Sequence, residues 1–267
     1  MNFVDINKNR IRYTLIEGDP CMPYLVFLHE GLGCIEMWKE FPVRLCRLCG
    51  CPGLLYDRQG YGQSSPFTLK RDIEYVHAYA QELGLLLDIL IGNRPFILVG
   101  HSDGASIALI YGAGEHHRLK AIVSEAAHVF VEAKTTAGVE AAYRHYRENG
   151  APKLIKYHGD KTDALFRAWG EIWLSDWFQS WNIEKLLPEI TCPVLVLQGT
   201  ADAYGTMKQV EAIASQVSGP AEPIMIKGCG HTPHRECGDL VLAYVQDFID
   251  RHVSPPHHAL TPNPQPS

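Results

Sequence analysis

Short apolar runs alternate along the chain with segments whose apolar positions recur at helical spacing. Most of these runs are continuously apolar, which is typical of strands buried on both faces of a parallel sheet. The first run alternates apolar and polar positions and, with the preceding FVDINKN, predicts an antiparallel hairpin at the sheet edge. The predicted strands are residues 10–17, 24–29, 53–57, 96–101, 121–127, 194–199 and 223–228.

Helical patterns lie between the predicted strands, at about residues 35–48, 71–91, 103–113, 206–217 and 237–252. Strands that alternate with helices in this way predict an α/β fold built on a doubly wound, mostly parallel sheet. The chain has 267 residues, 46% of them hydrophobic and 20% charged, so one α/β unit with a large core can form.

One interval, residues 131–187, interrupts the alternation because it contains no predicted strand and is helical and aromatic. Trp169, Trp173 and Trp177 are spaced i, i+4, i+8, which would place all three on one helical face. We expect these rings to pack the segment onto the main domain and to line an apolar substrate pocket above the sheet. The predicted organisation is a core domain (1–130 and 188–253), a helical cap (131–187) and a proline-rich, disordered tail (254–267).

Charge and apolar patterning narrow the classes of partner. The formal net charge is −6 and no basic stripe is present, which disfavours nucleic acid. No apolar segment reaches the roughly 18–20 residues that span a bilayer, and the N-terminal residues lack an apolar signal region. We therefore expect a cytoplasmic protein that does not enter membranes.

The chain has eight cysteines, and without a signal sequence we expect reduced thiols rather than disulfide bonds. Residues 46–51, CRLCGC, resemble half of a metal site, but no second CxxC and no suitably spaced histidine accompany them. The favoured interpretation is a helix end with small, partly buried thiols, so no metal site is predicted.

One apolar run stops at Gly100-His101-Ser102-Asp103-Gly104, which matches the pattern G-x-S-x-G. A predicted strand precedes the motif and a predicted helix follows it, as in a nucleophile elbow. The glycines allow a turn too tight for side chains, and the strained serine projects its hydroxyl at the carboxyl end of the strand. The N-terminus of the following helix favours negative charge at the same point. The motif therefore predicts that Ser102 is a nucleophile.

A serine hydroxyl needs a base, and the base needs an orienting acid, before the oxygen becomes nucleophilic. His231 follows the last predicted strand closely, and we favour it as the base over His234, which lies farther from the strand end. Asp202 lies just past the end of a buried strand and is the favoured acid, with Asp176 as a weaker candidate in the helical insertion. The order Ser…Asp…His matches that of α/β-hydrolases.

Acyl transfer also requires donors for the developing oxyanion. The backbone N–H of Asp103, directly after the serine, is one candidate. The second donor is expected from the glycine-rich loop of residues 27–38, where we favour the N–H of Gly31, with Glu30 as the alternative. Glycine at this position lets a substrate approach the main chain closely.

Together these motifs resemble those of α/β-hydrolase-fold serine hydrolases with a helical cap, of the carboxylesterase and lactonase type. The resemblance implies an eight-stranded, mostly parallel sheet, a helical cap inserted after strand six, and a catalytic triad of Ser102, Asp202 and His231. The fold hosts many chemistries, so it does not define the substrate. The matching motifs are residues 29–33 (HEGLG), 57–64 (DRQGYGQS), 100–104 (GHSDG), 199–202 (GTAD) and 230–231 (GH).

Two positions depart from the family pattern. Glu30 replaces the glycine of the usual His-Gly, and its carboxylate can face solvent, pair with Arg58, or contact a substrate hydroxyl or amine, so it is a candidate substrate contact. Asp103 stands where many relatives carry methionine, glutamine or tryptophan, and a carboxylate beside the nucleophile disfavours an anionic substrate head. The serine nucleophile argues against epoxide hydrolase or haloalkane dehalogenase chemistry.

The leading hypothesis is hydrolysis of a carboxylic ester, thioester or lactone with a small to medium apolar acyl part, with neither a cofactor nor a metal. The expected partner is this small-molecule substrate, whose size the aromatic insertion would limit. Two alternatives stay open: hydrolysis of a carbon–carbon bond by the same triad, and a ligand receptor that hydrolyses slowly.

Overall fold

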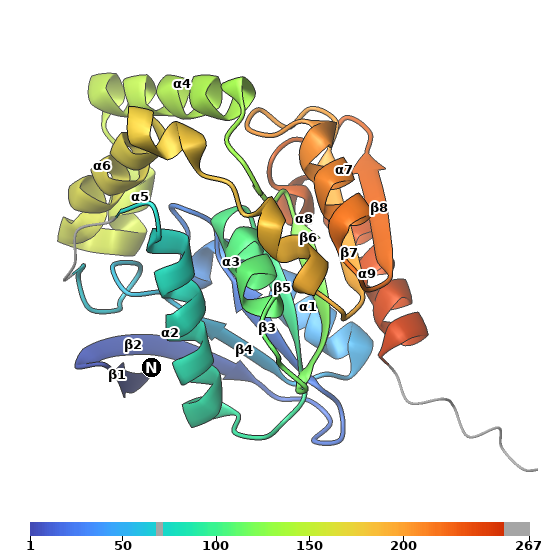
Figure 1. Cartoon of the computed structure of the whole chain (residues 1–267). Coiled ribbons are helices and arrows are strands. Elements are labelled where there is room, and N and C mark those ends of the chain that lie inside the picture. The colour runs from blue at the N-terminus through green and yellow to red at the C-terminus, as the bar shows by residue number, and fades with distance from the viewer. Residues whose placement is uncertain (68–71, 254–267) are drawn as a thin grey trace, which may run out of the picture.

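The computed structural model describes residues 1–67 and 72–253, and within them the strands form one mixed sheet (Figure 1). The strand order is β1-β2-β4-β3-β5-β6-β7-β8. The β1–β2 hairpin and the β2–β4 pair are antiparallel, and all other pairs are parallel, which confirms the predicted α/β fold. The strands are β1 (Asn2–Ile6), β2 (Asn9–Ile16), β3 (Tyr24–Leu28), β4 (Gly53–Tyr56), β5 (Phe96–His101), β6 (Leu119–Glu125), β7 (Val194–Gly199) and β8 (Ala221–Ile226).

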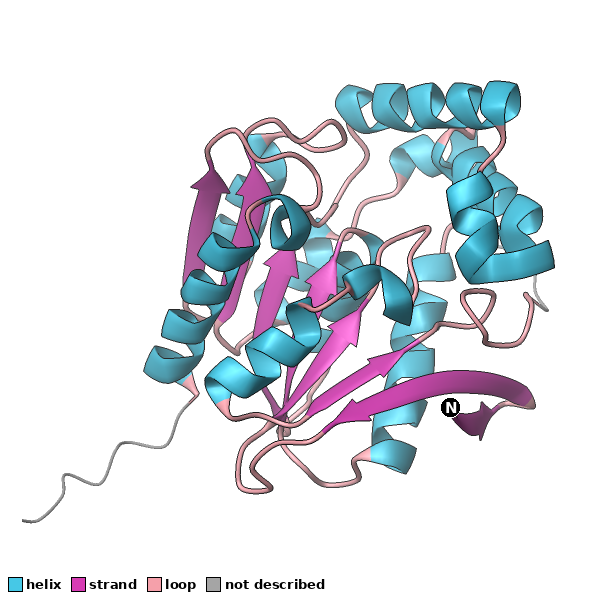
Figure 2. Cartoon of the chain, turned by 180° about the vertical axis from the view of Figure 1, so that it is seen from behind, coloured by secondary structure: helices cyan, strands magenta, loops and turns pink. Residues whose placement is uncertain are grey.

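Helices cover both faces of this sheet. Helices α2, α3 and α7 lie on one face, and α1 and α9 lie on the other, as the front and back views show (Figures 1 and 2). A short helix, α8, joins β8 to α9. These helices are α1 (Phe41–Cys49), α2 (Tyr75–Leu90), α3 (Asp103–Gly112), α7 (Met207–Gln216), α8 (Pro233–Glu236) and α9 (Gly238–His252).

Alternate side chains of the central strands face opposite helical layers. Val26 and Leu98 pack in the cluster that contains α2 and α3, whereas Leu25 and Ile97 pack in the cluster that contains α1 and α9. All residues of β5 are buried. Because both faces are covered, these strands have no polar side, and this explains their continuously apolar sequences.

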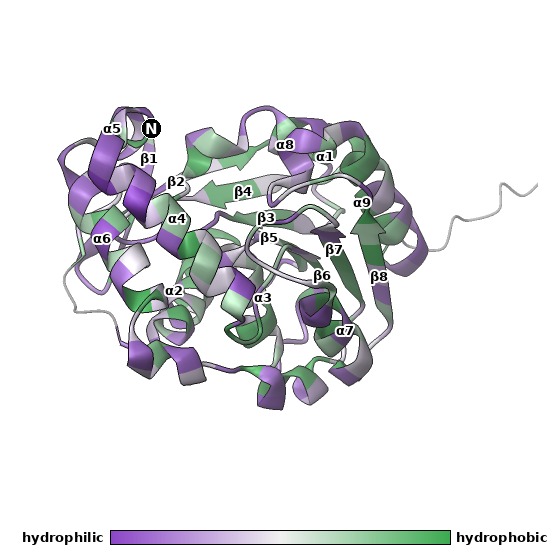
Figure 3. Cartoon of the chain, turned by 90° about the horizontal axis from the view of Figure 1, so that it is seen from above, coloured by the Kyte–Doolittle hydropathy of each residue, from purple (hydrophilic) through white to green (hydrophobic). Residues whose placement is uncertain are grey.

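The chain between β6 and β7 forms a group of helices above the carboxyl ends of the strands (Figure 1). Seen from above, α4 to α6 lie to one side of the strand ends and α7 to α9 to the other (Figure 3). The last 3-10 helix, η4, lies against α3 and α7 of the main domain. It includes residues on both sides of residue 187, where we predicted that the cap ends. The insertion contains α4 (Ala133–Asn149), α5 (Pro152–His158), η2 (Gly159–Lys161), α6 (Thr162–Trp173), η3 (Asp176–Ser180) and η4 (Glu184–Glu189).

The helix predicted over residues 35–48 is not continuous. A 3-10 helix, η1 (Ile35–Trp38), is separated from α1 by Lys39, whose φ of 56° lies in the left-handed region and ends the first segment. Helix α1 then begins at Phe41 and has Pro42 in its first turn, where the fixed φ of proline suits a helix. The predicted helix start at residue 71 and the predicted tail of residues 254–267 lie outside the described residues.

The CRLCGC segment closes α1. Gly50 caps the helix with a φ of 68°, a conformation that glycine adopts without strain, and burial raises the pKa of the Cys51 thiol to about 11. All eight cysteines lie in the described residues and are free thiols. In the part of the chain that the structure covers, no helix combines the length and the apolar character needed to cross a membrane.

Candidate active site

Ser102 occupies a sharp turn between β5 and α3. Its backbone has φ 52° and ψ −119°, outside the regions that L-residues favour. A Cβ on Gly104 would lie 2.0 Å from the carbonyl oxygen of Leu28, and a Cβ on Gly100 would lie 2.4 Å from that of Gly104. Only glycine therefore fits at these two positions, two residues before and two residues after the serine. The Ser102 N–H donates to the Glu125 carbonyl at 2.8 Å, which ties the turn to the end of β6.

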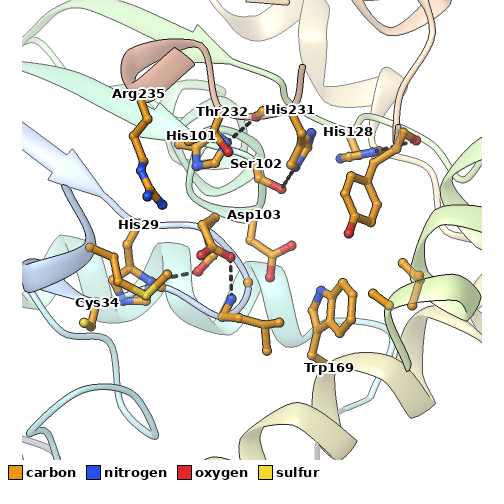
Figure 4. A pocket seen from close by; sticks show the side chains of 18 of the residues that line it. His29, Cys34, His101, Ser102, Asp103, His128, Trp169, His231, Thr232 and Arg235 are labelled. Carbon is orange, nitrogen blue, oxygen red and sulfur yellow. Dashed lines mark hydrogen bonds between the residues drawn. The ribbon is translucent and has the colours of Figure 1, made fainter. Parts of the chain in front are cut away.

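A chain of hydrogen bonds connects this serine to a carboxylate. His231 Nε2 lies 3.0 Å from Ser102 Oγ (Figure 4), and His231 Nδ1 lies 2.9 Å from both carboxylate oxygens of Asp202. Burial disfavours the charge of Asp202, but the hydrogen bond from His231, the charge interaction with His231 and the hydrogen bond from the Tyr204 N–H together outweigh it and hold the pKa of this carboxyl below its usual value. The ionised carboxylate fixes the imidazole with a bare nitrogen toward the hydroxyl, which is the arrangement that activates serine.

The two weaker candidates do not join this chain. His234 donates its backbone N–H to Glu125, and its Nδ1 lies 2.8 Å from Glu125 Oε2, so this side chain belongs to a second, buried pair. Asp176 lies exposed in η3. The structure therefore brings together Ser102, Asp202 and His231, which lie at the carboxyl ends of β5, β7 and β8.

Two backbone amides face the same region. Gly31 and Asp103 both line the cavity at Ser102, and among the described residues neither amide donates to a protein acceptor. The Asp103 amide opens α3, whose N-terminal end favours negative charge. A Cβ on Gly31 would lie 2.7 Å from the Trp169 ring, so this position admits no larger residue without a shift.

The carboxylates of Glu30 and Asp103 also line this cavity. Glu30 Oε2 accepts the Leu32 N–H at 2.6 Å, and burial raises the pKa of Glu30. Arg58 does not pair with the Glu30 carboxylate, since its guanidinium donates to the Glu30 carbonyl instead. Asp103 Oδ2 accepts from the Tyr75 hydroxyl at 3.3 Å.

The cavity has a volume of about 280 Å³ and lies between the strand ends and the insertion (Figure 4). Trp169 and Trp173 of α6 line it. Trp177 does not: its side chain is 48% exposed and it lies in η3. Helix α6 ends at Trp173, so the spacing of four residues that suggested a shared face does not continue to Trp177. The remaining apolar lining includes Met37, Trp38, Val139, Ala142 and Leu154.

Several polar residues of the cavity were not predicted, among them His128 and Tyr204. His128 lies three residues beyond β6, and its Nε2 lies 3.3 Å from the Tyr204 carbonyl. The Tyr204 ring packs against His231, with centroids 4.6 Å apart. The only sequence signal for both was their position, because each lies within five residues of the carboxyl end of a parallel strand, where such ends converge.

One group of side chains approaches the spacing of metal ligands. Donor atoms of Cys34, Glu36 and Asp57 lie within 4.8 Å of one another. The guanidinium of Arg12 already contacts both carboxylates, at 3.4 Å from Asp57 Oδ2, and burial raises the pKa of Cys34 far above the range in which a thiolate forms. The two carboxylates therefore already share a cation of the protein, and the thiol stays protonated.

The serine lies in a nucleophile elbow and is hydrogen-bonded through a histidine to a carboxylate. All three lie at the carboxyl edge of a sheet with this strand order. This combination defines the class of α/β-hydrolases. A model described as "Alpha/beta hydrolase family" matches residues 25–244, and the chain belongs to this family of hydrolytic enzymes.

Its relatives are distant. The chain is 25% identical to alpha/beta hydrolase domain-containing protein 17B of Homo sapiens over 226 residues, covering 84% of this chain but only 65% of that protein. It is 24% identical to a proline iminopeptidase of Lactobacillus helveticus, with 90% of this chain and 94% of that protein covered. The solved enol-lactonase of Burkholderia xenovorans LB400 superposes with a TM-score of 0.72 at 17% identity, covering 93% of this chain and 100% of that chain. This last likeness shows the fold alone.

Proposed function

We propose that the protein hydrolyses a carboxylic ester, thioester or lactone with a small to medium apolar acyl group. Ser102 attacks the carbonyl carbon while His231 takes the hydroxyl proton and returns it to the leaving group. Water, deprotonated by His231, then releases the acid from the acyl-enzyme. Asp202 orients the imidazole and stabilises its cation. The N–H groups of Gly31 and Asp103 would bind the oxyanion, and the reaction requires neither a cofactor nor a metal.

The observation that carries the proposal is the unbroken hydrogen-bond chain from Ser102 through His231 to Asp202, with links of 3.0 and 2.9 Å. A proline iminopeptidase among the similar proteins supports chemistry at an acyl carbonyl. The eight free thiols support the reducing, cytoplasmic setting that the sequence predicts.

The lining of the cavity also supports a preference for neutral, apolar acyl groups. Trp169 and Trp173 present apolar surface from the insertion, so we expect the acyl chain to lie against them. Glu30 and Asp103 also line the cavity and would repel a carboxylate or phosphate on the acyl group. Neutral apolar esters should therefore be turned over faster than esters of the same length that end in a carboxylate, while hydroxyl or amine groups are tolerated near Glu30.

The test is turnover of short p-nitrophenyl esters by the wild-type protein and by Ser102→Ala. We expect the substitution to abolish turnover. Ser124→Ala is the matched control, because it removes another buried hydroxyl, one strand away on β6, that has no hydrogen-bond partner among the described residues. Undiminished turnover by Ser102→Ala would remove the mechanism.

Two further assays separate the alternatives. Faster cleavage of a vinylogous 1,5-diketone than of an ester of similar shape would favour carbon–carbon bond hydrolysis. Turnover far slower than once per minute on every ester, with a ligand-induced loss of thermal stability, would favour a receptor.

A further inference from the structure

The carbonyl oxygen of Glu30 accepts hydrogen bonds from three donors. Arg58 Nη2 lies 2.9 Å away, His29 Nδ1 lies 2.8 Å away, and the Gly33 N–H lies 3.1 Å away. The other terminal nitrogen of Arg58 donates to the His29 carbonyl at 2.7 Å. The guanidinium thus bridges two successive carbonyls of the loop that carries Gly31.

The Glu30 carbonyl belongs to the same peptide unit as the Gly31 N–H. In a planar trans peptide these two groups point in opposite directions. Donors that hold the carbonyl on one side therefore turn the N–H to the other side. Gly31 lines the cavity at Ser102, and its amide has no protein acceptor among the described residues.

We propose that Arg58 and His29 are positioning residues for the oxyanion hole: they hold the Glu30–Gly31 peptide so that the Gly31 N–H points at the reacting carbonyl. This inference rests on the proposed function, because it assigns the loop amide to a developing oxyanion. Neither side chain needs to touch the substrate.

The chemistry of the two donors supports this role. Arg58 is fully buried, and its guanidinium lies 4.7 Å from the Tyr61 ring centroid and 5.0 Å from that of Tyr79. Burying a cation is costly, so a guanidinium at this place needs the carbonyls it binds. A hydrogen bond from a cation is stronger than one from a neutral donor and polarises the peptide, which makes the Gly31 N–H a better donor.

His29 belongs to the same hydrogen-bond network. Its Nε2 accepts the Arg58 backbone N–H at 3.2 Å, so the ring proton is on Nδ1, which donates to the Glu30 carbonyl. The imidazole is 2% exposed and packs against Tyr61, with ring centroids 4.8 Å apart. This neutral donor can be removed without leaving an unpaired buried charge.

The central test compares His29→Asn with His29→Leu. Asparagine and leucine have nearly the same size and shape, so the two variants leave similar space, but only asparagine keeps an N–H donor at the position of Nδ1. We expect His29→Leu to lose about tenfold or more in kcat relative to His29→Asn, with KM changed much less. Thermal unfolding of both variants reports on the fold separately.

A second readout isolates the oxyanion. Each variant is assayed on an oxoester and on the thionoester with the same acyl and alcohol groups. Sulfur accepts N–H hydrogen bonds poorly, so a well-aimed Gly31 N–H favours the oxoester. The oxoester-to-thionoester rate ratio should fall in His29→Leu and stay near the wild-type value in His29→Asn. A general loosening of the fold would lower both rates and leave the ratio unchanged.

Arg58→Lys provides an independent variant if His29→Leu does not fold. Lysine keeps the buried charge but lacks the fork that reaches both carbonyls, so kcat and the rate ratio should both fall by about tenfold. Arg94→Met is the matched control: Arg94 donates to the Met22 carbonyl at 3.1 Å and lies 4.9 Å from the Tyr24 ring, away from the cavity.

The outcomes separate the two proposals. If the wild-type protein has no esterase activity that depends on Ser102, the proposed function fails. If the wild type is active but His29→Leu matches His29→Asn, or folded Arg58→Lys matches the wild type, in kcat and in the rate ratio, the positioning role is overturned.

Discussion

The backbone of Ser102 predicts that glycine at this position makes the protein more stable than alanine does. With φ 52° and ψ −119°, the residue lies in a region that costs an L-residue about 1–3 kcal/mol and costs glycine little. Glycine also makes the unfolded chain more flexible, and this lowers the free energy of unfolding by about 0.4–1 kcal/mol relative to alanine. Ser102→Gly should therefore exceed Ser102→Ala in the free energy of unfolding by about 0.5–2 kcal/mol.

The comparison is clean because both variants lack the hydroxyl and both should be inactive. The free energy of unfolding is measured by urea denaturation, and the melting temperature of the glycine variant should be higher by a few degrees. Ala105→Gly is the matched control in the same helix: Ala105 lies inside α3 in ordinary helical conformation, so glycine there should destabilise by about 1 kcal/mol or more.

Equal stability of the two serine variants, or a less stable glycine variant, would refute the view that the turn stores strain. Ser102 would then hold its position through ordinary packing. A more stable but inactive glycine variant would show that folding free energy is given up to aim a hydroxyl at His231.

Two further predictions concern carboxyl groups. Asp202→Asn should lower kcat by about 10⁴-fold with little change in KM, because the amide donates to His231 Nδ1 and moves the ring proton to the nitrogen that faces the serine; a loss below tenfold would contradict the assigned acid. Burial raises the pKa of Glu82 to about 7, above its value of about 4.3 in the unfolded chain. The folded protein therefore holds a proton that the unfolded chain has released, and stability should fall as pH rises from about 4 to about 7. Glu82→Gln should flatten this dependence and gain at most a few kcal/mol at pH 8, as urea midpoints at pH 5 and pH 8 would show; an unchanged slope would reject the assignment.

The juxtaposition of Ser102, Asp202 and His231 could be predicted from the sequence, because the fold has few places for these side chains. Ser102, Asp202 and His231 each follow an apolar run closely, and the carboxyl ends of parallel strands meet at one edge. Choosing His231 over His234 needed only the distance from the strand end. What the sequence did not show is that His234 has its own buried partner, Glu125.

Other features of the structure could not be predicted, because they depend on contacts that the spacing of residues in the sequence does not reveal. The interval between Trp173 and Trp177 continues a helical period, but helix α6 stops at Trp173, and nothing in the pattern marks that end. Lys39 breaks a predicted helix by adopting a left-handed conformation that its side chain does not signal. The bridge from Arg58 to two carbonyls involves main-chain atoms, which every residue carries, so the sequence shows the arginine but not its partners.

The helical insertion leaves the sheet after β6 and returns at β7, and these two strands are hydrogen-bonded neighbours. The segment therefore begins and ends at adjacent points, and the strand pairing beneath it does not depend on its length. Ser102, Asp202 and His231 thus lie outside the stretch that supplies Trp169 and Trp173 to the cavity wall, while Met37 and Trp38 line the cavity from the core. Exchange of the stretch between β6 and β7 offers a route to new substrates in which the apparatus for hydrolysis is inherited intact.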